Sequence, residues 1–263
     1  MTMTVLTLLV KARNAGQLNQ IDELLKGEFE NLGLDFKVLG APVNKWVQVS
    51  LSGEDEVIAT NYINKEIGTC PISIKKVEKN QVLKGYITKL DKSKNQLTVD
   101  VGIFEPKITL ATIPLTHLQA QLADGKKVDL KKIEEAYGLH ENLPLAIKVT
   151  DLDGEDGDER LQAELSAAQL DKLRLWQQSF LDRLIVLGAT AADVEAVLER
   201  TRLNRDVIDV ERLGLFEYAL TCKLGTDAAG LVPRMGRYMR NVVLVVFNPR
   251  EVFRLIGEMP LAL

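Results

Sequence analysis

The spacing of apolar residues changes at about residue 80 and again at about residue 165, which divides the sequence into three segments. In residues 1–80, short apolar runs alternate with stretches where apolar residues return every three or four positions. From Val82 the apolar runs are short and closely spaced, with turn residues between them. After residue 165, helical stretches and apolar runs alternate again. We therefore expect three domains, at residues 1–80, 81–165 and 166–263.

The first segment has the order strand, helix, strand, strand, helix, strand. Leu18, Ile21, Leu25 and Phe29 lie on one helical face, and the expected last strand, residues 71–77, alternates Ile72 and Ile74. Two strand–helix–strand halves within about 80 residues predict a ferredoxin-like α+β layer.

The last segment starts with a linker helix at residues 166–184 and then follows a similar order of strands and helices. Thr190 is the expected N-cap of its next helix, with Asp193 three residues on. The β-branched run at residues 241–249 predicts the final strand. This order predicts a second small α+β domain, and the chain as a whole is expected to be an α+β multidomain protein.

The middle segment contains five short strands with helical material after the third, which predicts an OB-type β-barrel. Its motifs are Gly85-Tyr86-Ile87, then Leu97-Thr98-Val99-Asp100-Val101-Gly102, then Thr112-Ile113-Pro114-Leu115 with Leu118. These motifs resemble an S1-type OB domain, although "DKSKNQL" replaces the aromatic motif that this family carries before its second strand. The full chain also resembles an uncharacterised archaeal family, a domain of unknown function, that embeds such a barrel between two α+β domains. The stretch "LGLFEYALTCKLGTDAAGLVPRMG" carries that resemblance.

S1 domains bind single-stranded RNA by stacking bases on exposed aromatic rings, with cations along the backbone. The resemblance therefore implies that Tyr86 and Phe104 stack on bases and that Lys84 and Lys89 contact phosphates. Residues 81–165 carry 15 acidic against 11 basic residues. This acidic balance leaves a structural or protein-binding barrel as the alternative.

The basic residues change type after residue 165, where 11 of the 13 arginines but only 2 of the 20 lysines lie. Arginine can bind a phosphate through two parallel hydrogen bonds, whereas lysine acts as a point charge. Residues 228–250 hold four arginines and no acid. We expect an RNA-binding basic patch made of Lys223, Arg234, Arg237, Tyr238 and Arg240. The alternative is a solvated helix end whose arginines pair with acids from elsewhere in the fold, such as Asp193, Glu195 or Glu217.

Residues that could carry catalysis or bind metals show no characteristic spacing. His117 and His140 have no carboxylate or cysteine at ligand spacing, and Cys70 and Cys222 read as reduced thiols. The acidic run Asp151–Glu159 fails the register of a calcium loop and is expected to be a hairpin tip. We predict no catalytic residue, no metal site and no cofactor.

The stretch "KLGTDAAG", residues 223–230, has two interpretations. Its backbone N–H groups at a helix start could bind an anion. Alternatively, Thr226 or Asp227 simply caps the helix.

The function hypothesis is a non-enzymatic, cytoplasmic RNA-associated protein that binds ribosomal or other structured or single-stranded RNA. Its partner is expected to be RNA or a ribonucleoprotein such as the ribosome. One alternative is a protein-interaction adaptor in translation, transcription or RNA processing, and another is an enzyme with a site between domains.

The net charge of −4 argues against indiscriminate coating of nucleic acid. No apolar run reaches the roughly 18 to 20 residues of a membrane span, so a soluble chain is expected. The oligomeric state stays open.

Overall fold

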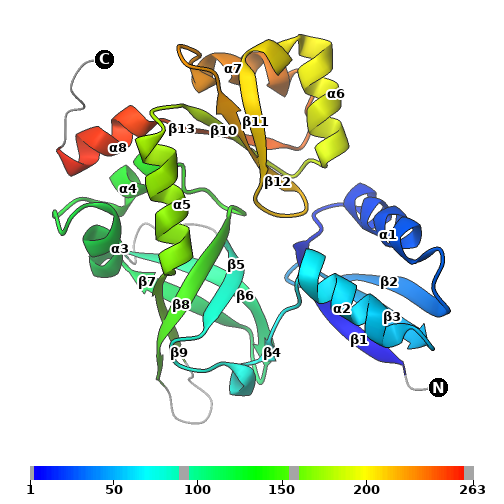
Figure 1. The fold of residues 1–263 in the computed structure, drawn as a ribbon. Helices are drawn as coiled ribbons and strands as arrows, with labels where there is room; N and C mark the ends of the chain where they lie inside the picture. The colour runs from blue at the N-terminus through cyan, green and yellow to red at the C-terminus, as the bar shows by residue number, and fades with distance from the viewer. Residues whose placement is uncertain (1–2, 89–94, 154–159, 258–263) are drawn as a thin grey trace. The chain divides into compact units, whose positions relative to one another are not determined.

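The structure, a computed structural model, describes residues 3–88, 95–153 and 160–257. Within these ranges the chain is an α+β protein with eight α-helices, a closed five-stranded mixed β-barrel and further sheets (Figure 1). The chain divides into two compact units. The first comprises residues 1–77 and 102–109, and the second comprises residues 78–101 and 110–263.

The first unit is built on a three-stranded antiparallel sheet in the order β1-β3-β2. Its elements are β1 (Thr4–Lys11), α1 (Ala15–Phe29), β2 (Leu34–Val43), β3 (Trp46–Gly53), α2 (Glu56–Glu66), β4 (Ile72–Ser73) and the 3-10 helix η1 (Ile74–Lys76). Phe29 of α1 meets Phe36 of β2 and Tyr62 of α2 edge-on, with ring centroids 5.6 and 5.7 Å apart. These apolar contacts pack both helices against the sheet, as the helical face predicted from the sequence requires.

The strand predicted at residues 71–77 is wrong in length and place. Only the two residues Ile72–Ser73 pair as a strand, and they pair in parallel with β6 instead of completing the sheet of β1. Beside β1, the chain contributes a single antiparallel bridge between Leu8 and Thr69. Gly68 and Ile72 have φ angles of 90° and 64°, in the left-handed region, and Ile74–Lys76 forms a 3-10 helix, so residues 71–77 do not form one regular strand.

The barrel is formed by five strands, as predicted, with helical material after the third. The elements are β5 (Val82–Ile87), β6 (Gln96–Glu105), β7 (Thr109–Pro114), α3 (Leu115–Leu122), α4 (Leu130–Tyr137), β8 (Pro144–Asp153) and β9 (Arg160–Leu165). The pairing runs β6-β5-β8-β9-β7 and closes through β6 and β7. Strands β7 and β9 are parallel, while β5 pairs antiparallel with both β6 and β8. Alternating Leu97, Val99 and Val101 of β6 are fully buried, so the period-2 pattern fills the barrel core.

The rest of the second unit contains the predicted second α+β arrangement. Its elements are α5 (Ala167–Gln178), β10 (Arg183–Leu187), α6 (Ala191–Thr201), the 3-10 helix η2 (Leu203–Arg205), β11 (Val207–Arg212), β12 (Glu217–Cys222), α7 (Ala228–Gly236), β13 (Val243–Phe247) and α8 (Pro249–Ile256). The sheet order is β11-β12-β10-β13, and each pair is antiparallel. The predicted cap is confirmed, because Thr190 and Asp193 form a capping box at the start of α6. Helix α8, which the sequence analysis did not predict, follows β13 directly.

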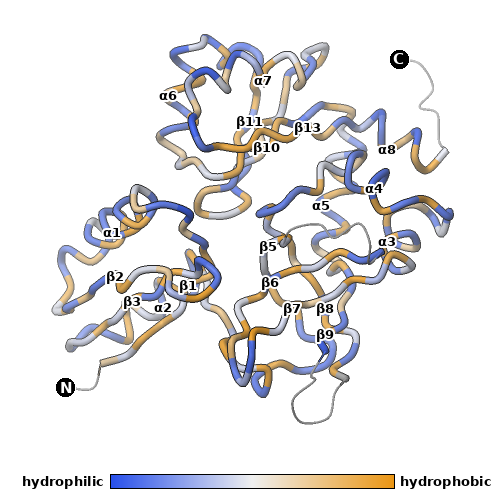
Figure 2. The backbone as a smooth tube through the Cα atoms, turned by 180° about the vertical axis from the view of Figure 1, so that it is seen from behind, coloured by the Kyte–Doolittle hydropathy of each residue, from blue (hydrophilic) through white to orange (hydrophobic). Residues whose placement is uncertain are grey.

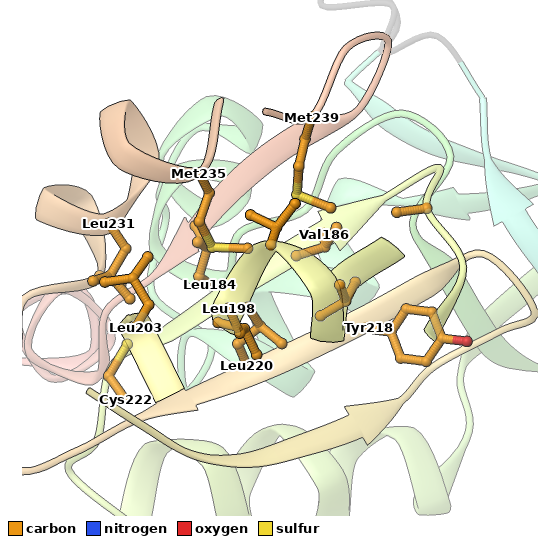
Figure 3. Packing of buried hydrophobic residues seen from close by; sticks show 14 residues of the cluster. Leu184, Val186, Leu198, Leu203, Tyr218, Leu220, Cys222, Leu231, Met235 and Met239 are labelled. Carbon is orange, nitrogen blue, oxygen red and sulfur yellow. The ribbon is translucent and has the colours of Figure 1, made fainter. Parts of the chain in front are cut away.

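One face of this sheet packs against α6 and α7 in a buried apolar cluster (Figure 3). Leu184, Val186 and Leu220 contribute from the strands, and Leu198 and Met235 contribute from the helices. Figure 2 shows the corresponding strong orange colour of β10 and β13. Helix α5 connects the barrel to this sheet (Figure 1), and its Trp176 meets Phe247 of β13 edge-on, with centroids 5.3 Å apart.

Candidate nucleic-acid interface

Tyr86 is buried, with only 3% of its surface exposed, so the expectation that it offers a stacking surface is wrong. It lies in β5 opposite Asp100 of β6, which is 1% exposed. The Tyr86 hydroxyl donates a hydrogen bond to Glu217 Oε2 at 3.4 Å, and Glu217 is also 1% exposed. The loop between β11 and β12 therefore covers this face of the barrel. Sequence pattern cannot show this, because the covering residues lie about 130 positions further along the chain.

The other barrel residues expected to bind RNA are scattered. Lys84 is exposed in β5, whereas Phe104 is half-buried and belongs to the first unit. Lys89 and most of the acidic run, residues 154–159, lie outside the described residues. Among the described residues of the barrel strands, no aromatic side chain is exposed. Tyr86 therefore does not provide the stacking surface expected of an S1-type RNA site, and Phe104 is accessible only in part.

Four of the residues expected in the basic patch, Arg234, Arg237, Tyr238 and Arg240, lie in α7 or just after it, and three arginines that were not expected there lie at the end of α6 or just after it. We call this set the arginine surface. It consists of Arg200, Arg202, Arg205, Arg234, Arg237, Tyr238 and Arg240, and each of these side chains is exposed. Met235 and Met239 are buried in the cluster of Figure 3, at 0% and 7% exposure. Because these methionines point inward four positions apart, the residues between and beside them point to solvent.

Arg234 has an internal role within this surface. Its guanidinium lies 3.4 Å from Asp206 Oδ2 and donates a hydrogen bond to the carbonyl oxygen of Thr201 at 3.0 Å. Thr201 is the last residue of α6, so Arg234 satisfies a carbonyl at the negative end of that helix. For this one arginine, the alternative of pairing with an acid from elsewhere in the fold is correct, with Asp206 as the acid.

Arg200 and Tyr238 form a contact that the sequence analysis missed. The Arg200 guanidinium lies over the Tyr238 ring, 4.5 Å from its centroid. Tyr238 nevertheless keeps 45% of its surface exposed. A cation over one face of a tyrosine ring is a stabilising arrangement that also holds the ring in place. The two residues are 38 positions apart, so no local sequence signal joins them.

Four arginines of this surface carry no counter-charge from the described residues. Arg202, Arg205, Arg237 and Arg240 make no ion pair with any acid in residues 3–88, 95–153 or 160–257. Lys223 is exposed, and its backbone N–H donates to the carbonyl oxygen of Asp206 at 2.7 Å, which places Lys223 beside the ion pair of Arg234. Asp206 thus borders a surface on which positive charge is in excess.

The start of α7 is capped, as one interpretation of "KLGTDAAG" predicted. Asp227 accepts a hydrogen bond from the backbone N–H of Ala229 at 2.8 Å. Asp182 accepts one from the backbone N–H of Ala228 at 3.2 Å. Burial raises the pKa of the Asp182 carboxyl. Two carboxylates occupy the donors that an anion would need, so the anion-site interpretation of this stretch is wrong.

Comparisons with known families match the barrel and the domain that follows it. Residues 77–177 match a family model described as the DUF2110 central domain, and residues 181–247 match one described as the DUF2110 C-terminal domain. The chain belongs to the DUF2110 family. A search of curated proteins found no match.

In this DUF2110 chain, all five barrel strands lie in the central-domain range, and the whole arginine surface lies in the C-terminal-domain range. In the described ranges, no three histidine, cysteine, aspartate or glutamate residues are placed to hold a metal ion. Cys70 and Cys222 are buried thiols that are not joined in a disulfide. No helix in the described parts of the chain is both long and apolar enough to cross a membrane.

Proposed function

We propose that this DUF2110 chain is a non-enzymatic, RNA-associated protein that contacts RNA phosphates through the arginine surface. The observation that carries the proposal is the local charge. Six arginines from the ends of α6 and α7 share one exposed surface, and Asp206 is the single acid paired with them among the described residues. Arginine is suited to phosphate binding because its planar fork matches two phosphate oxygens.

The fold is consistent with this proposal. The pairing order of the barrel, closed through β6 and β7 and with β7 parallel to β9, fits an OB barrel of the S1 type. The order β11-β12-β10-β13 fits a ferredoxin-like layer, and the β1-β3-β2 sheet fits three of the four strands of such a layer. Both folds occur in RNA-binding modules, but fold alone does not establish function.

The barrel has a secondary role in the proposal. OB barrels bind oligonucleotides with the face of their second and third strands and the flanking loops. In this chain Tyr86 of the first barrel strand is buried, and the segment between the fourth and fifth strands is rich in aspartate and glutamate in the sequence. Acidic side chains repel phosphates, so the barrel is not proposed as the main RNA site. The other expected barrel residues, Lys84, Lys89 and Phe104, are proposed only as supporting contacts. Ribosomal RNA, other structured RNA and a ribonucleoprotein remain the proposed partners.

The salt dependence of RNA binding tests this function. The probe is a fluorescein-labelled single strand of about 16 nucleotides, and the variant is Arg237→Ala with Arg240→Ala. Each lost phosphate contact reduces the log–log salt slope by about 0.7, so the double variant should flatten the slope by about 1.4. The matched control is Arg174→Ala with Arg254→Ala, which removes two exposed arginines that already pair with acids three residues away. The control should leave the slope unchanged, and an unchanged slope in the test variant would sink the proposal.

A protein-interaction adaptor is the second candidate. It is favoured by the edge strand β11, where Ile208 and Val210 are 57% and 39% exposed. An edge strand with apolar side chains can add a strand from a partner protein. Ile208→Lys would abolish such pairing and leave RNA binding intact.

A further inference from the structure

We infer that the arginine surface takes single-stranded RNA, with one unpaired base stacked on Tyr238 and with Arg200 holding the ring from behind. This inference rests on the proposed function. It assigns single-stranded RNA as the class of ligand and Tyr238 as the residue that contacts the base.

The position of Tyr238 is fixed by its neighbours. The Tyr238 N–H donates to the carbonyl oxygen of Met235 at 2.9 Å, and the N–H of Met239 donates to the same oxygen at 3.2 Å. Met235 and Met239 are both buried in the apolar cluster, where Figure 3 shows them beside Leu184 and Val186. The backbone on both sides of Tyr238 is therefore anchored, and the ring is presented from a rigid position.

Arg200 covers one face of the Tyr238 ring, and part of the Tyr238 side chain remains exposed to solvent. Arg200 lies 4.5 Å from the ring centroid, which occupies one face. The residue as a whole still has 45% of its surface exposed. A base that stacks on the open side would complete a sandwich of guanidinium, phenol ring and base. Stacking of this kind tolerates any base, because every base has a π-face.

The neighbouring charges select an RNA strand over other flat ligands. Arg237 precedes Tyr238 directly and Arg240 follows two positions later, and both are exposed without an acidic partner among the described residues. A base on Tyr238 would therefore bring its flanking phosphates to unpaired guanidinium groups. In duplex RNA the base faces are stacked inside the helix and cannot reach a protein ring. The same surface can bind a duplex only through its phosphates, which makes strandedness the distinguishing property.

The experiment removes the aromatic ring from the protein in one comparison and the bases from the RNA probe in another. The probes are a fluorescein-labelled oligoadenylate of about 16 nucleotides, the same strand paired in a duplex, and an abasic strand of equal length. Tyr238→Leu keeps a side chain of similar bulk without the π-face, and Tyr238→Phe keeps the ring. Fluorescence anisotropy should show that Tyr238→Leu weakens oligoadenylate binding by about 5- to 150-fold, the effect of one stacked base. Binding of the abasic strand and of the duplex should not change, and Tyr238→Phe should match the wild-type protein.

Arg200 is tested as a positioning residue. Arg200→Ala should weaken oligoadenylate binding more than abasic-strand binding, because the ring loses its support as well as one charge. When Tyr238→Leu is already present, Arg200→Ala should affect both strands equally. This dependence on the base is not expected of a residue that only stabilises the fold.

The outcomes separate this inference from the proposed function. Two results would overturn the inference and leave the proposed function standing, provided that the Arg237 and Arg240 variant flattens the salt slope. In the first, Tyr238→Leu weakens binding of the abasic strand as much as binding of oligoadenylate. In the second, Tyr238→Leu weakens binding of neither strand. Tighter binding of the duplex than of the single strand overturns it as well. An unchanged salt slope in the arginine variant removes the proposed function and the inference together. Because Tyr238 is exposed, urea unfolding of Tyr238→Leu should stay cooperative, with its midpoint lowered only by the lost contact with Arg200, and that measurement confirms an intact fold.

Discussion

Replacing Gly214 with alanine should destabilise the second unit by about 2 kcal/mol, because the site has no room for a methyl group beside a buried carboxylate. Gly214 lies in the loop between β11 and β12, where its N–H and that of Leu213 both donate to the carbonyl oxygen of Glu217. A Cβ atom at residue 214 would overlap Glu217 Oε2 and would lie 3.4 Å from the Tyr86 hydroxyl. The carboxylate would have to move away from the barrel.

The expected size of the effect follows from the hydrogen bonds of Glu217. Its Oε2 accepts from the Tyr86 hydroxyl at 3.4 Å and from the N–H of Phe216 at 3.3 Å. Hydrogen bonds to a charged group contribute about 1.5 to 3 kcal/mol each, and bonds of this length belong at the low end. Losing both costs about 3 kcal/mol, and the smaller conformational entropy of unfolded alanine returns about 0.4 to 1 kcal/mol.

Urea unfolding measures this difference, and a double-mutant cycle identifies its cause. In a Glu217→Ala background the carboxylate is absent, so Gly214→Ala should no longer destabilise the protein. The matched control is Gly230→Ala, since Gly230 lies inside α7 and a Cβ there meets nothing within 4 Å. That control should stabilise the protein by about 0.5 to 1 kcal/mol. If Gly214→Ala leaves stability unchanged, or costs the same in both backgrounds, the close approach of Glu217 is not what requires glycine.

Three further predictions concern packing and ionisation in the second unit. Gly85→Ala should destabilise the barrel by about 1 to 3 kcal/mol in urea unfolding, because its Cβ would overlap the backbone carbonyl oxygen of Asp100, which cannot rotate away. Met235→Ala should cost about 2 to 5 kcal/mol and weaken RNA binding, since Met235 is fully buried and anchors the backbone beside Tyr238. Burial raises the pKa of the Cys222 thiol from 9.0 to about 11, so its contribution to stability is complete below pH 9.0 and is lost as the pH rises through about 11. The free energy of unfolding of the wild-type protein, measured with urea, should therefore fall over this window by about 2 kcal/mol more than that of Cys222→Ala.

The predictable part of the fold is the part that local periodicity determines. The order of strands and helices in the C-terminal domain follows from alternation and from the capping pair Thr190 and Asp193, whose geometry is local. Helix α8 was missed although its start is signalled: Asn248 caps it and Pro249 occupies its first turn, followed by buried Val252 and Phe253. That signal was assigned to the end of the preceding strand instead.

The errors at the expected site arise from contacts between distant residues. Tyr86 stands in a sequence context typical of an exposed platform, but the loop that ends at Glu217 buries it. In the same way, Arg234 is paired because Asp206 lies beside it, and one face of the Tyr238 ring is covered because Arg200 lies over it. Local sequence identifies Arg237, Tyr238 and Arg240 as an acid-free group, whereas tertiary packing determines which cations stay available.

A net charge of −4 is compatible with an RNA-binding surface because charges act locally in salt solution. At physiological ionic strength the Debye length is about 8 Å, so acids on the outer barrel are screened from a phosphate at Tyr238. Of the six arginines of the arginine surface, Arg234 alone forms an ion pair among the described residues, with Asp206. In the proposed interface a phosphate would therefore meet several unpaired arginines, while the acidic remainder of the protein would disfavour RNA that approaches elsewhere. Under the proposed function, an overall negative charge would confine association to one face, so that a small acidic protein could bind RNA at a defined site without coating it.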